Sequence, residues 1–203
     1  MSRPLRQPRE ELRQSILGVA RGILDREGME GLSARAIARE INYTAATIYN
    51  VFSSMSDIVM EINRETLAEV ARLFTALPRD LSAAERLRML ARSYVEFMQD
   101  NPARWNALFG GNRQRESFPD WYTGTIEGLK LQLAHLLIEH DDHLDRLRAE
   151  RLAEHLFVSV HGALTLGIGR RLDLLTQRDM LDVAMAGVDL VLTTLGGRQG
   201  QAE

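Results

Sequence analysis

The sequence predicts an all-α protein, with an N-terminal three-helix helix-turn-helix domain followed by a C-terminal helical bundle. Apolar residues recur at spacings of three and four along most of the 203 residues, which is the period of an α-helix. Capping residues, Gly and Pro separate the segments that carry this period. No segment alternates apolar and polar residues as a half-buried strand does. The chain is long enough to bury an ample core.

The first nine residues combine Arg and Pro with almost no apolar residue, so we expect a flexible arm over residues 1–9. Such an arm either reaches DNA, as in some other helix-turn-helix proteins, or is a solvated tail. The first helix is expected over 10–27, and Gly28 is the residue type that ends a helix in the left-handed conformation. Its apolar stripe consists of Leu12, Ile16, Val19, Ala20, Ile23 and Leu24.

Residues 31–52 predict two short helices joined by a tight turn. Ser33 and Thr44 are favoured N-cap residues, one for each helix. Asn42 tolerates the left-handed conformation that ends the first of them. The residues expected to point inward are Ala34, Ile37, Ala38, Ile41, Ile48, Val51 and Phe52. This is the geometry in which the second helix of a pair enters the major groove of DNA.

The outer and leading face of the second short helix carries small, hydroxyl-bearing and aromatic side chains: Thr44, Ala45, Ala46, Thr47, Tyr49 and Asn50. Short side chains suit a helix that lies against a polyanion, and Asn50 can reach the DNA backbone or a base. Arg35, at the start of the first short helix, adds a phosphate or base contact. Residues 1–60 hold eight Arg against seven acidic residues, whereas the whole chain has a net charge of −3.

The remainder of the chain predicts further helices. A polar joint at 53–56 precedes a long helix that ends at Leu77, before Pro78, and that is able to link the two domains. Ser82 and Glu85 form a capping box for the next helix. Later helices are expected over 102–109, 120–139, 144–171 and 176–195. We therefore divide the chain into a DNA-binding domain, residues 1–55, and a sensing and dimerisation domain, residues 56–203.

The last two predicted helices are apolar around much of their circumference, so each must bury two faces. One face packs within its own domain, and the other is free to meet a second copy of the chain. Small residues such as Gly162, Gly167 and Gly187 allow helices to approach closely. We therefore expect a two-fold homodimer that joins through a four-helix bundle.

Aromatic side chains gather in the middle of the chain and predict an apolar ligand pocket. The candidates are Tyr94, Phe97, Met98, Trp105, Phe109, Trp121, Tyr122 and Phe157, with His161 as the polar member. The alternative is that these residues form ordinary hydrophobic core and that His161 is a buried, hydrogen-bonded histidine.

The helix-turn-helix stretch resembles the DNA-binding domain of the tetracycline-repressor (TetR) family. That family runs Ile-Ala, a small hydroxyl residue, Gly-Thr-Leu-Tyr, Phe, then Ser-Lys and an acidic residue. The matching residues here are Ile37-Ala38, Thr44, Ala46-Thr47-Ile48-Tyr49, Phe52, Ser54-Met55 and Asp57. The segments 92–105 and 160–164 are similar to one type of C-terminal sensing domain in TetR-like regulators, which has a His-Gly helix.

The resemblance implies roles for single residues. Thr44, Thr47 and Tyr49 fall on phosphate-contacting positions, Ser33 falls on a phosphate-contacting cap, and Ala45 and Ala46 fall on base-edge positions. Two Ala side chains offer only apolar contact, for instance to a thymine methyl.

The chain departs from the family pattern at three positions. Asn42 replaces Gly, a mild change. Val51 and Met55 replace residues that usually contact phosphate. The charge that holds DNA is then expected from Arg35, Arg39 and the segment from Arg3 to Arg13.

The implied function is a ligand-responsive transcriptional regulator, most simply a repressor that a small apolar or amphipathic effector releases from a palindromic operator. Two alternatives stay open at this point. The turn His140–His143 holds imidazole and carboxylate groups that suit Zn²⁺ or Ni²⁺, which would make the protein metal-responsive. A helical enzyme or carrier would use the aromatic residues and His161 without DNA affinity.

Composition excludes other classes. The chain has no Cys, and therefore no disulfide, thiolate zinc site or cysteine nucleophile. No Gly-rich phosphate loop, nucleophile elbow or metalloprotease His pair is present, so we expect neither an enzyme nor a bound cofactor or metal. No apolar run approaches the ~20 residues of a membrane span, and no signal-peptide core is present. We expect a cytoplasmic protein without membrane contact.

Overall fold

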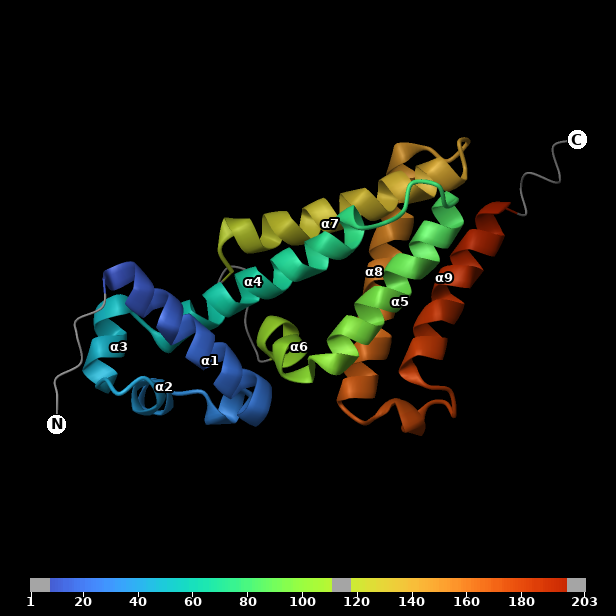
Figure 1. Cartoon of the computed structure of the whole chain (residues 1–203). Helices are drawn as coiled ribbons and strands as arrows, with labels where there is room; N and C mark the ends of the chain where they lie inside the picture. The colour runs from blue at the N-terminus through green and yellow to red at the C-terminus, as the bar shows by residue number, and fades with distance from the viewer. Residues whose placement is uncertain (1–7, 111–117, 197–203) are drawn as a thin grey trace, which may run out of the picture. The chain divides into compact units, whose positions relative to one another are not determined.

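The computed structural model describes residues 8–110 and 118–196, and every regular element within these ranges is helical (Figure 1). The N-terminal helices are α1 (Arg9–Gly31), α2 (Ala34–Glu40), α3 (Ala45–Val51) and the long α4 (Met55–Thr75). They are followed by α5 (Ala83–Asp100), α6 (Pro102–Phe109), α7 (Asp120–His140), α8 (Arg146–Ile168), the 3₁₀ turn η2 (Leu172–Leu174) and α9 (Met180–Gly196). The predicted all-α class is confirmed. Within the described ranges, no helix is both long enough and apolar enough to cross a membrane.

The helices form two compact units. The described part of the first comprises residues 8–67 and 101–110, so α6 belongs with α1, α2, α3 and the first half of α4. The described part of the second comprises residues 68–100 and 118–196. The functional division expected at residue 55 coincides with the first residue of α4 and stays a prediction. Residues 1–7 of the expected arm lie outside the described residues, and Arg9 already belongs to α1.

The core of the first unit lies between α1, α2, α3 and the start of α4. Its fully buried side chains include Ile16 and Ile23 from α1, Ile37 from α2 and Ile48 from α3. The apolar stripe predicted for the first helix is confirmed, because its remaining members Leu12 and Val19 pack against the same cluster. Gly28 has a φ of 71° and breaks the regular helix within α1, as its expected capping role requires.

The core of the second unit joins α5, α7, α8 and α9: α8 packs against α7 and α9, and α5 packs against all three. Leu137 of α7 and Leu195 of α9 are almost completely buried in it. The predicted capping box of α5 is confirmed: Ser82 Oγ accepts from Glu85 N at 3.3 Å, and the Glu85 carboxylate accepts from Ser82 N at 2.9 Å. The Ser82 hydroxyl also donates to the Glu85 carboxylate at 2.6 Å, and this bond, together with the one from Ser82 N, lowers the pKa of Glu85.

Several helix ends differ from the sequence expectation. α4 ends at Thr75 rather than Leu77, and α8 and α9 begin later than expected, at Arg146 and Met180. For α8 and α9 the cause is an acidic N-cap at each start, which the sequence reasoning missed. Asp145 accepts from Arg148 N at 3.0 Å, and Asp179 accepts from Asp182 N at 2.7 Å. The sequence signal for both caps was an Asp just before the helix, which is a favoured N-cap residue.

Candidate functional site

The turn between α2 and α3 is held by hydrogen bonds local in sequence. Ser33 Oγ accepts from Ala36 N at 3.2 Å and starts α2. Asn42 has a φ of 57°. It allows Tyr43 N to donate to Ala38 O at 2.9 Å, the six-to-one hydrogen bond of a Schellman motif. Asn42 therefore adopts the left-handed conformation that Gly adopts in the family pattern. The predicted end of the first short helix, α2, is confirmed.

Two threonines build the start of α3. Thr44 Oγ1 accepts from Thr47 N at 3.2 Å and lies 3.0 Å from Thr47 Oγ1. Only one of the two hydroxyl hydrogens is needed for the contact between the threonines. The other hydroxyl hydrogen stays available, so the pair has one donor for an external acceptor such as a phosphate oxygen.

The side chains expected to face DNA are mostly exposed. Ser33, Arg35, Thr44, Ala46 and Asn50 are exposed, as is Tyr49. Thr47 is partly buried, and Ala45 packs against the core of the first unit, so its methyl group is only partly offered to a base. Ile48, between them, is fully buried and fixes the orientation of α3.

Val51 and Met55, the two departures from the family pattern, both pack against the core of the first unit. The inward position expected for Val51 is therefore confirmed. Next to Met55, Ser54 and Asp57 form a capping box that the sequence reasoning left as a polar joint. Asp57 N donates to Ser54 Oγ at 3.2 Å, and Ser54 N donates to the Asp57 carboxylate at 2.8 Å.

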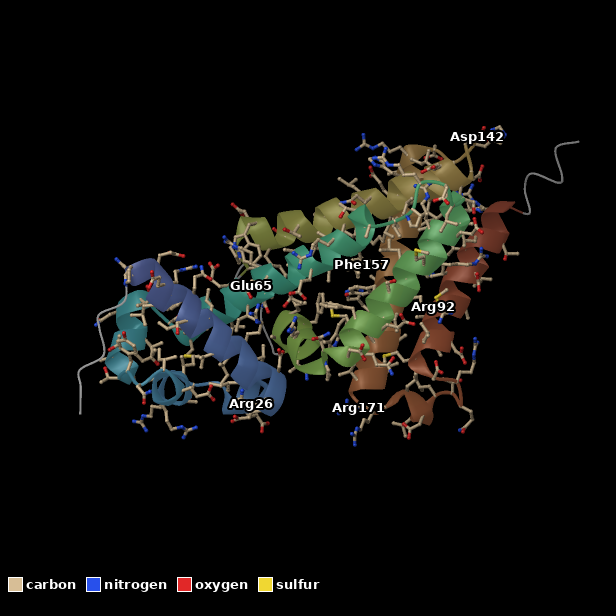
Figure 2. The ribbon with its side chains drawn as sticks, viewed as in Figure 1. Arg26, Glu65, Arg92, Asp142, Phe157 and Arg171 are labelled. Carbon is tan, nitrogen blue, oxygen red and sulfur yellow. The ribbon has the colours of Figure 1, made fainter. Side chains whose placement is uncertain are left out.

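The arginines of the first unit fall into two groups. Arg35 and Arg39 on α2 are exposed and have no ion-pair partner among the described residues. Arg21 and Arg26, in contrast, pair with Glu65 and Glu40, at 2.7 Å and 2.6 Å. Arg26 and Glu65 are labelled in Figure 2. Arg35 and Arg39 therefore have their charge free for phosphate, unlike Arg21 and Arg26.

Arg13 was expected to lend its charge to DNA, and the structure corrects this. Its guanidinium lies 3.1 Å from the carboxylate of Glu61 and 5.3 Å from the ring centroid of Phe52. The side chain is only 31% exposed. Arg13 therefore links α1 to α4 within the first unit, and it does not belong to a basic arm that contacts DNA. Arg3 and Arg6 lie outside the described residues.

The first unit contains a buried polar contact that the sequence reasoning missed. Asn63 on α4 is 1% exposed and donates to Ala107 O of α6 at 3.0 Å, while its Oδ1 accepts no hydrogen bond from the described residues. Arg104 of α6 donates two hydrogen bonds of 3.0 Å to Asp25 of α1. Helix α6 is thus fixed to both α1 and α4 within this unit. The sequence signal was that Asn63 comes directly after Ile62 and four residues after Val59, two apolar residues at helical spacing that belong to the core.

The nine ligand candidates are divided between the units. Trp105 and Phe109, on α6, contact each other in the first unit with ring centroids 4.6 Å apart. The other seven lie in the second unit: Tyr94, Phe97 and Met98 on α5, Trp121 and Tyr122 on α7, and Phe157 and His161 on α8. Met98 is fully buried core, whereas Tyr94, Phe157 and His161 keep some exposed surface.

Three of these candidates form one contact group, which spans α5 and α8. Tyr94 Oη lies 3.0 Å from His161 Nε2, and the rings of His161 and Phe157, the latter labelled in Figure 2, stack with centroids 4.1 Å apart. His161 Nδ1 lies 2.7 Å from the carbonyl oxygen of Phe157. Burial lowers the pKa of His161 to about 4 and raises that of Tyr94, so both groups are neutral at neutral pH.

The turn at His140–His143 gives the metal hypothesis no support. Among the described residues, no group of three or more His, Asp or Glu side chains is arranged to hold a metal ion. His140 instead faces Leu192 O of α9 at 3.4 Å, and the buried Asp141 accepts from His143 N at 3.1 Å. These contacts stabilise the turn, which is the ordinary role of Asp and His in such a position.

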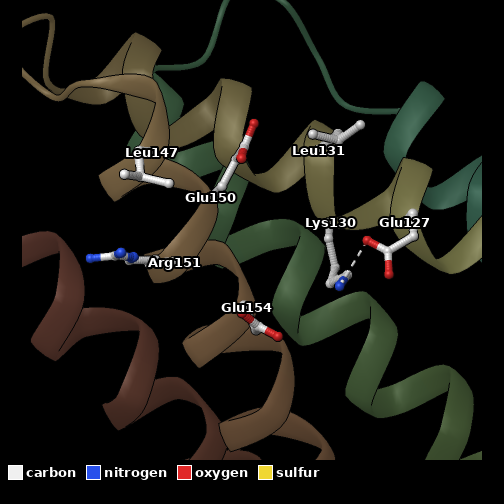
Figure 3. A pocket seen from close by; sticks show the side chains of 7 residues that line it. All are labelled: Glu127, Lys130, Leu131, Leu147, Glu150, Arg151 and Glu154. Atoms are coloured by element: carbon white, nitrogen blue, oxygen red, sulfur yellow. Dashed lines mark ion pairs between the residues drawn. The ribbon is translucent and has the colours of Figure 1, made fainter.

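A surface groove of about 260 Å³ lies between α7 and α8 (Figure 3). Its lining is mostly charged: Lys130 and Glu127 form an ion pair of 2.9 Å, and Arg151 and Glu154 lie across from them on α8. Leu131 and Leu147 add two exposed apolar side chains. None of the aromatic candidates lines this groove, so it is separate from the Tyr94–His161 group.

A capped helix pair with an exposed second helix, supported by a third helix and followed by a helical bundle, defines a helix-turn-helix DNA-binding protein. Residues 16–62 match the family model of "Bacterial regulatory proteins, tetR family". The N-terminal part of the chain therefore carries a DNA-binding domain of the TetR type, as its sequence motifs predicted.

Two curated relatives are similar to the chain over most of its length, and one solved structure shares its fold. An HTH-type transcriptional regulator of Staphylococcus aureus (strain USA300) is 23% identical over 157 residues, which cover 77% of this chain and 83% of that protein. An HTH-type regulator of Mycobacterium tuberculosis is 21% identical over 95% of this chain and 84% of its own length. The crystal structure of a tetR-family transcriptional regulator from Streptomyces coelicolor shares the fold, with a TM-score of 0.69, 17% identity, and coverage of 94% of this chain and 83% of that one.

Proposed function

We propose that this DNA-binding regulator is a homodimeric repressor, which a small apolar or amphipathic effector releases from a palindromic operator. It acts in the cytoplasm, where chromosomal DNA lies. The observation that carries the proposal is the exposed face of α3, which begins at a capped end and follows the capped helix α2. Arg35 and Arg39 on α2 add positive charge and have no ion-pair partner in the part of the chain that the structure describes.

The α3 face supports a role in DNA positioning. The Thr44–Thr47 pair has one free hydroxyl donor, and Tyr49 is 51% exposed one turn further along. Both groups suit phosphate oxygens, which fix a protein's register on the duplex. Ala46 is small and exposed, and it permits close approach and apolar contact with a thymine methyl. Arg35 and Arg39 supply the positive charge that these side chains lack.

The last two helices support a homodimer. Val158 on α8 and Leu190 on α9 are 63% and 68% exposed, which is unusual for large apolar residues on regular helices. Gly162 and Gly187 have open space where a Cβ would stand, so another helix is able to approach them closely. A second copy of the same two helices would cover these faces in a four-helix bundle. Two operator-binding helices would then meet major-groove sites about one DNA turn, roughly 34 Å, apart.

The effector response rests on a shift between two conformations. Helix α4 contributes residues to both units, so its tilt is suited to carry a change from the sensing unit to the DNA-binding unit. The effector must bind the DNA-incompetent conformation more tightly, because equal affinity for both conformations would shift nothing.

The test is a salt-dependent mobility-shift assay with purified protein and the DNA that flanks its gene. We expect a sequence-preferring complex whose affinity falls steeply with salt, with two protein chains per operator. Binding that shows neither sequence preference nor salt dependence would overturn the proposal.

A further inference from the structure

Four exposed side chains form one stripe along α8. Leu147 and Val158 are 58% and 63% exposed, and Arg151 and Glu154 between them are also exposed. Their spacings of four, three and four residues keep all four within about 60° around the helix axis. The α8 stripe therefore presents, in order, an apolar, a basic, an acidic and an apolar side chain to the surface.

The two charges of the α8 stripe are not used within the chain. Neither Arg151 nor Glu154 has an ion-pair partner among the described residues, whereas the neighbouring Arg146 and Glu150 pair with each other at 2.7 Å. Leu147, Arg151 and Glu154 also line the groove between α7 and α8 (Figure 3). The stripe is thus an exposed surface whose charges are available to another molecule.

The order of the four residues is self-complementary under a two-fold rotation. Leu147 precedes Arg151 by four residues, and Val158 follows Glu154 by four, so both pairs share one midpoint. A two-fold axis perpendicular to α8 at this midpoint places a second α8 alongside in the antiparallel direction. Each Arg151 then lies opposite Glu154 of the other copy, and each Leu147 lies opposite Val158. An axis at Val158 would instead place Glu154 opposite Gly162 and leave both charges without a partner.

The α8 stripe is continuous with the surface that supports the proposed homodimer, because Val158 belongs to both. Helix α9 runs back along α8, since Gly167 lies against the side chain of Met180. Ten residues after Met180, Leu190 is therefore level with Val158, and it is 68% exposed. In the antiparallel arrangement, Leu190 and Val158 of one copy both come to the level of Leu147 of the other.

We propose that a second copy of the chain docks on the α8 stripe, with the two α8 helices antiparallel and two reciprocal Arg151–Glu154 ion pairs across the two-fold axis. This inference rests on the proposed homodimer and specifies its alignment and its selectivity. The ion pairs lie at the centre of the contact, where like charges facing each other are costly. A chain with another charge pattern at these two positions is therefore disfavoured as a partner.

The test mixes two charge-reversed variants of the full-length chain. Arg151→Glu makes carboxylates face each other in its own dimer, and Glu154→Arg does the same with guanidinium groups. Each variant alone should dimerise at least about tenfold more weakly than the native chain. In an equimolar mixture every charge again faces an opposite one, so the heterodimer should form with close to native affinity. Native mass spectrometry distinguishes the heterodimer from both homodimers by mass, and sedimentation equilibrium gives the Kd.

Two further variants complete the comparison. Arg92→Glu is the matched control, because Arg92 is 53% exposed on α5 and lies outside the α8 stripe, and it should dimerise as the native chain does. The double variant Arg151→Glu, Glu154→Arg restores both ion pairs and should recover the homodimer. Single variants that dimerise as tightly as the native chain, or a mixture without an excess of heterodimer, would overturn the inference.

Introduced cysteines test the alignment of the two helices, since the native chain has no Cys. The variant Leu147→Cys, Val158→Cys should cross-link two copies on mild oxidation, because the two positions face each other across the axis. Neither single variant should cross-link, because in its dimer the two cysteines lie about 16 Å apart along the helices. Efficient cross-linking of the single Val158→Cys variant would place the axis at Val158 and overturn the inference.

These measurements separate the inference from the proposed function. If the native protein is a dimer that binds its operator, but the charge variants dimerise normally, the homodimeric regulator stands and the α8 alignment fails. If the charge variants behave as expected but no operator is bound, the α8 contact stands and the regulator proposal fails. A native protein that is monomeric at every concentration would overturn both.

Discussion

Arg13 and Glu61 form an ion pair of 3.1 Å between α1 and α4, and the Arg13 guanidinium also lies over the ring of Phe52 at the end of α3. The Arg13 side chain of α1 therefore contacts both α4 and the end of the recognition helix α3. Both members of the pair are less than one-third exposed, which favours a defined geometry over a fluctuating surface contact. Arg13 thus positions the DNA-binding surface rather than forming part of it.

Arg13→Met should weaken operator binding without changing its salt dependence. Met keeps much of the apolar stem and loses the charge that Glu61 holds. We expect a stability loss of about 1 kcal/mol, from an ion pair and a cation–π contact that are both partly exposed. Arg35→Ala is the matched comparison: it should lower the salt slope by about one unit with little effect on stability. Salt-titrated fluorescence anisotropy measures both slopes.

Two outcomes bear on the role of Arg13. A lowered slope in Arg13→Met would show that Arg13 touches phosphate. The double variant Arg13→Glu, Glu61→Arg should recover part of the operator affinity that Arg13→Glu loses. A double variant that binds no better than Arg13→Glu alone would count against a positioning role for the Arg13–Glu61 ion pair.

Thr47→Ala and Tyr49→Phe should weaken DNA binding while the thermal midpoint barely moves. Each removes one hydroxyl from the α3 face and breaks no cap, because Thr44 supplies the capping oxygen. Thr44→Ala is the contrasting variant and should cost about 1 kcal/mol of stability through the lost cap. Thermal melts and anisotropy on the same preparations separate the two effects. Unchanged affinity in both hydroxyl variants would remove the phosphate role of this face.

Met55→Lys should tighten DNA binding and steepen the salt slope by about one unit. Met55 packs partly against the core of the first unit at the first position of α4. A Lys stem is able to follow the same apolar surface and carry its ammonium group to the rim. Met55→Gln, of similar length and without charge, is the control. An equal slope in the Lys and Gln variants would place this residue away from phosphate.

Leu190→Arg should convert the dimer to a monomer and abolish operator binding. Leu190 is 68% exposed on α9, so within a single chain the change should alter stability by no more than about 0.5 kcal/mol. Leu175, 71% exposed outside the helix faces, is the matched control, and Leu175→Arg should stay dimeric. Sedimentation velocity reports the mass. If the Leu190→Arg variant were still a dimer, the dimer interface would have to lie elsewhere on the chain.

The free energy of unfolding should fall as the pH drops from about 6.5 toward 4 because of His161. Its pKa is lowered from 6.5 to about 4 in the folded protein, so the unfolded chain binds the proton first and gains stability from it. The contribution is absent above pH ~6.5 and reaches about 3 kcal/mol near pH ~4, an upper value. His161→Phe should flatten this part of the pH profile, measured by urea unfolding. A profile unchanged by the variant would mean that His161 titrates normally.

The sequence determined the helices, their caps and the family motif, because those features depend on contacts within a few residues. Ser33 and Thr44 bind backbone N–H groups three positions on, and Asn42 needs only its own left-handed conformation. Caps at Asp145 and Asp179 were equally local, and a search for acidic N-caps would have found them. The buried stripe of α1 followed from spacing alone.

The tertiary structure decided which charges are free and which polar groups meet. Glu61 is distant in sequence from Arg13, and Tyr94 lies 67 positions before His161. No local sequence pattern therefore predicts the Arg13–Glu61 ion pair or the Tyr94–His161 contact. The sequence also did not predict that α6 packs in the first unit, where Asn63 and Arg104 hold it. Helical periodicity specifies which face of a helix is buried. Only the packing of whole helices specifies which side chains meet across that face.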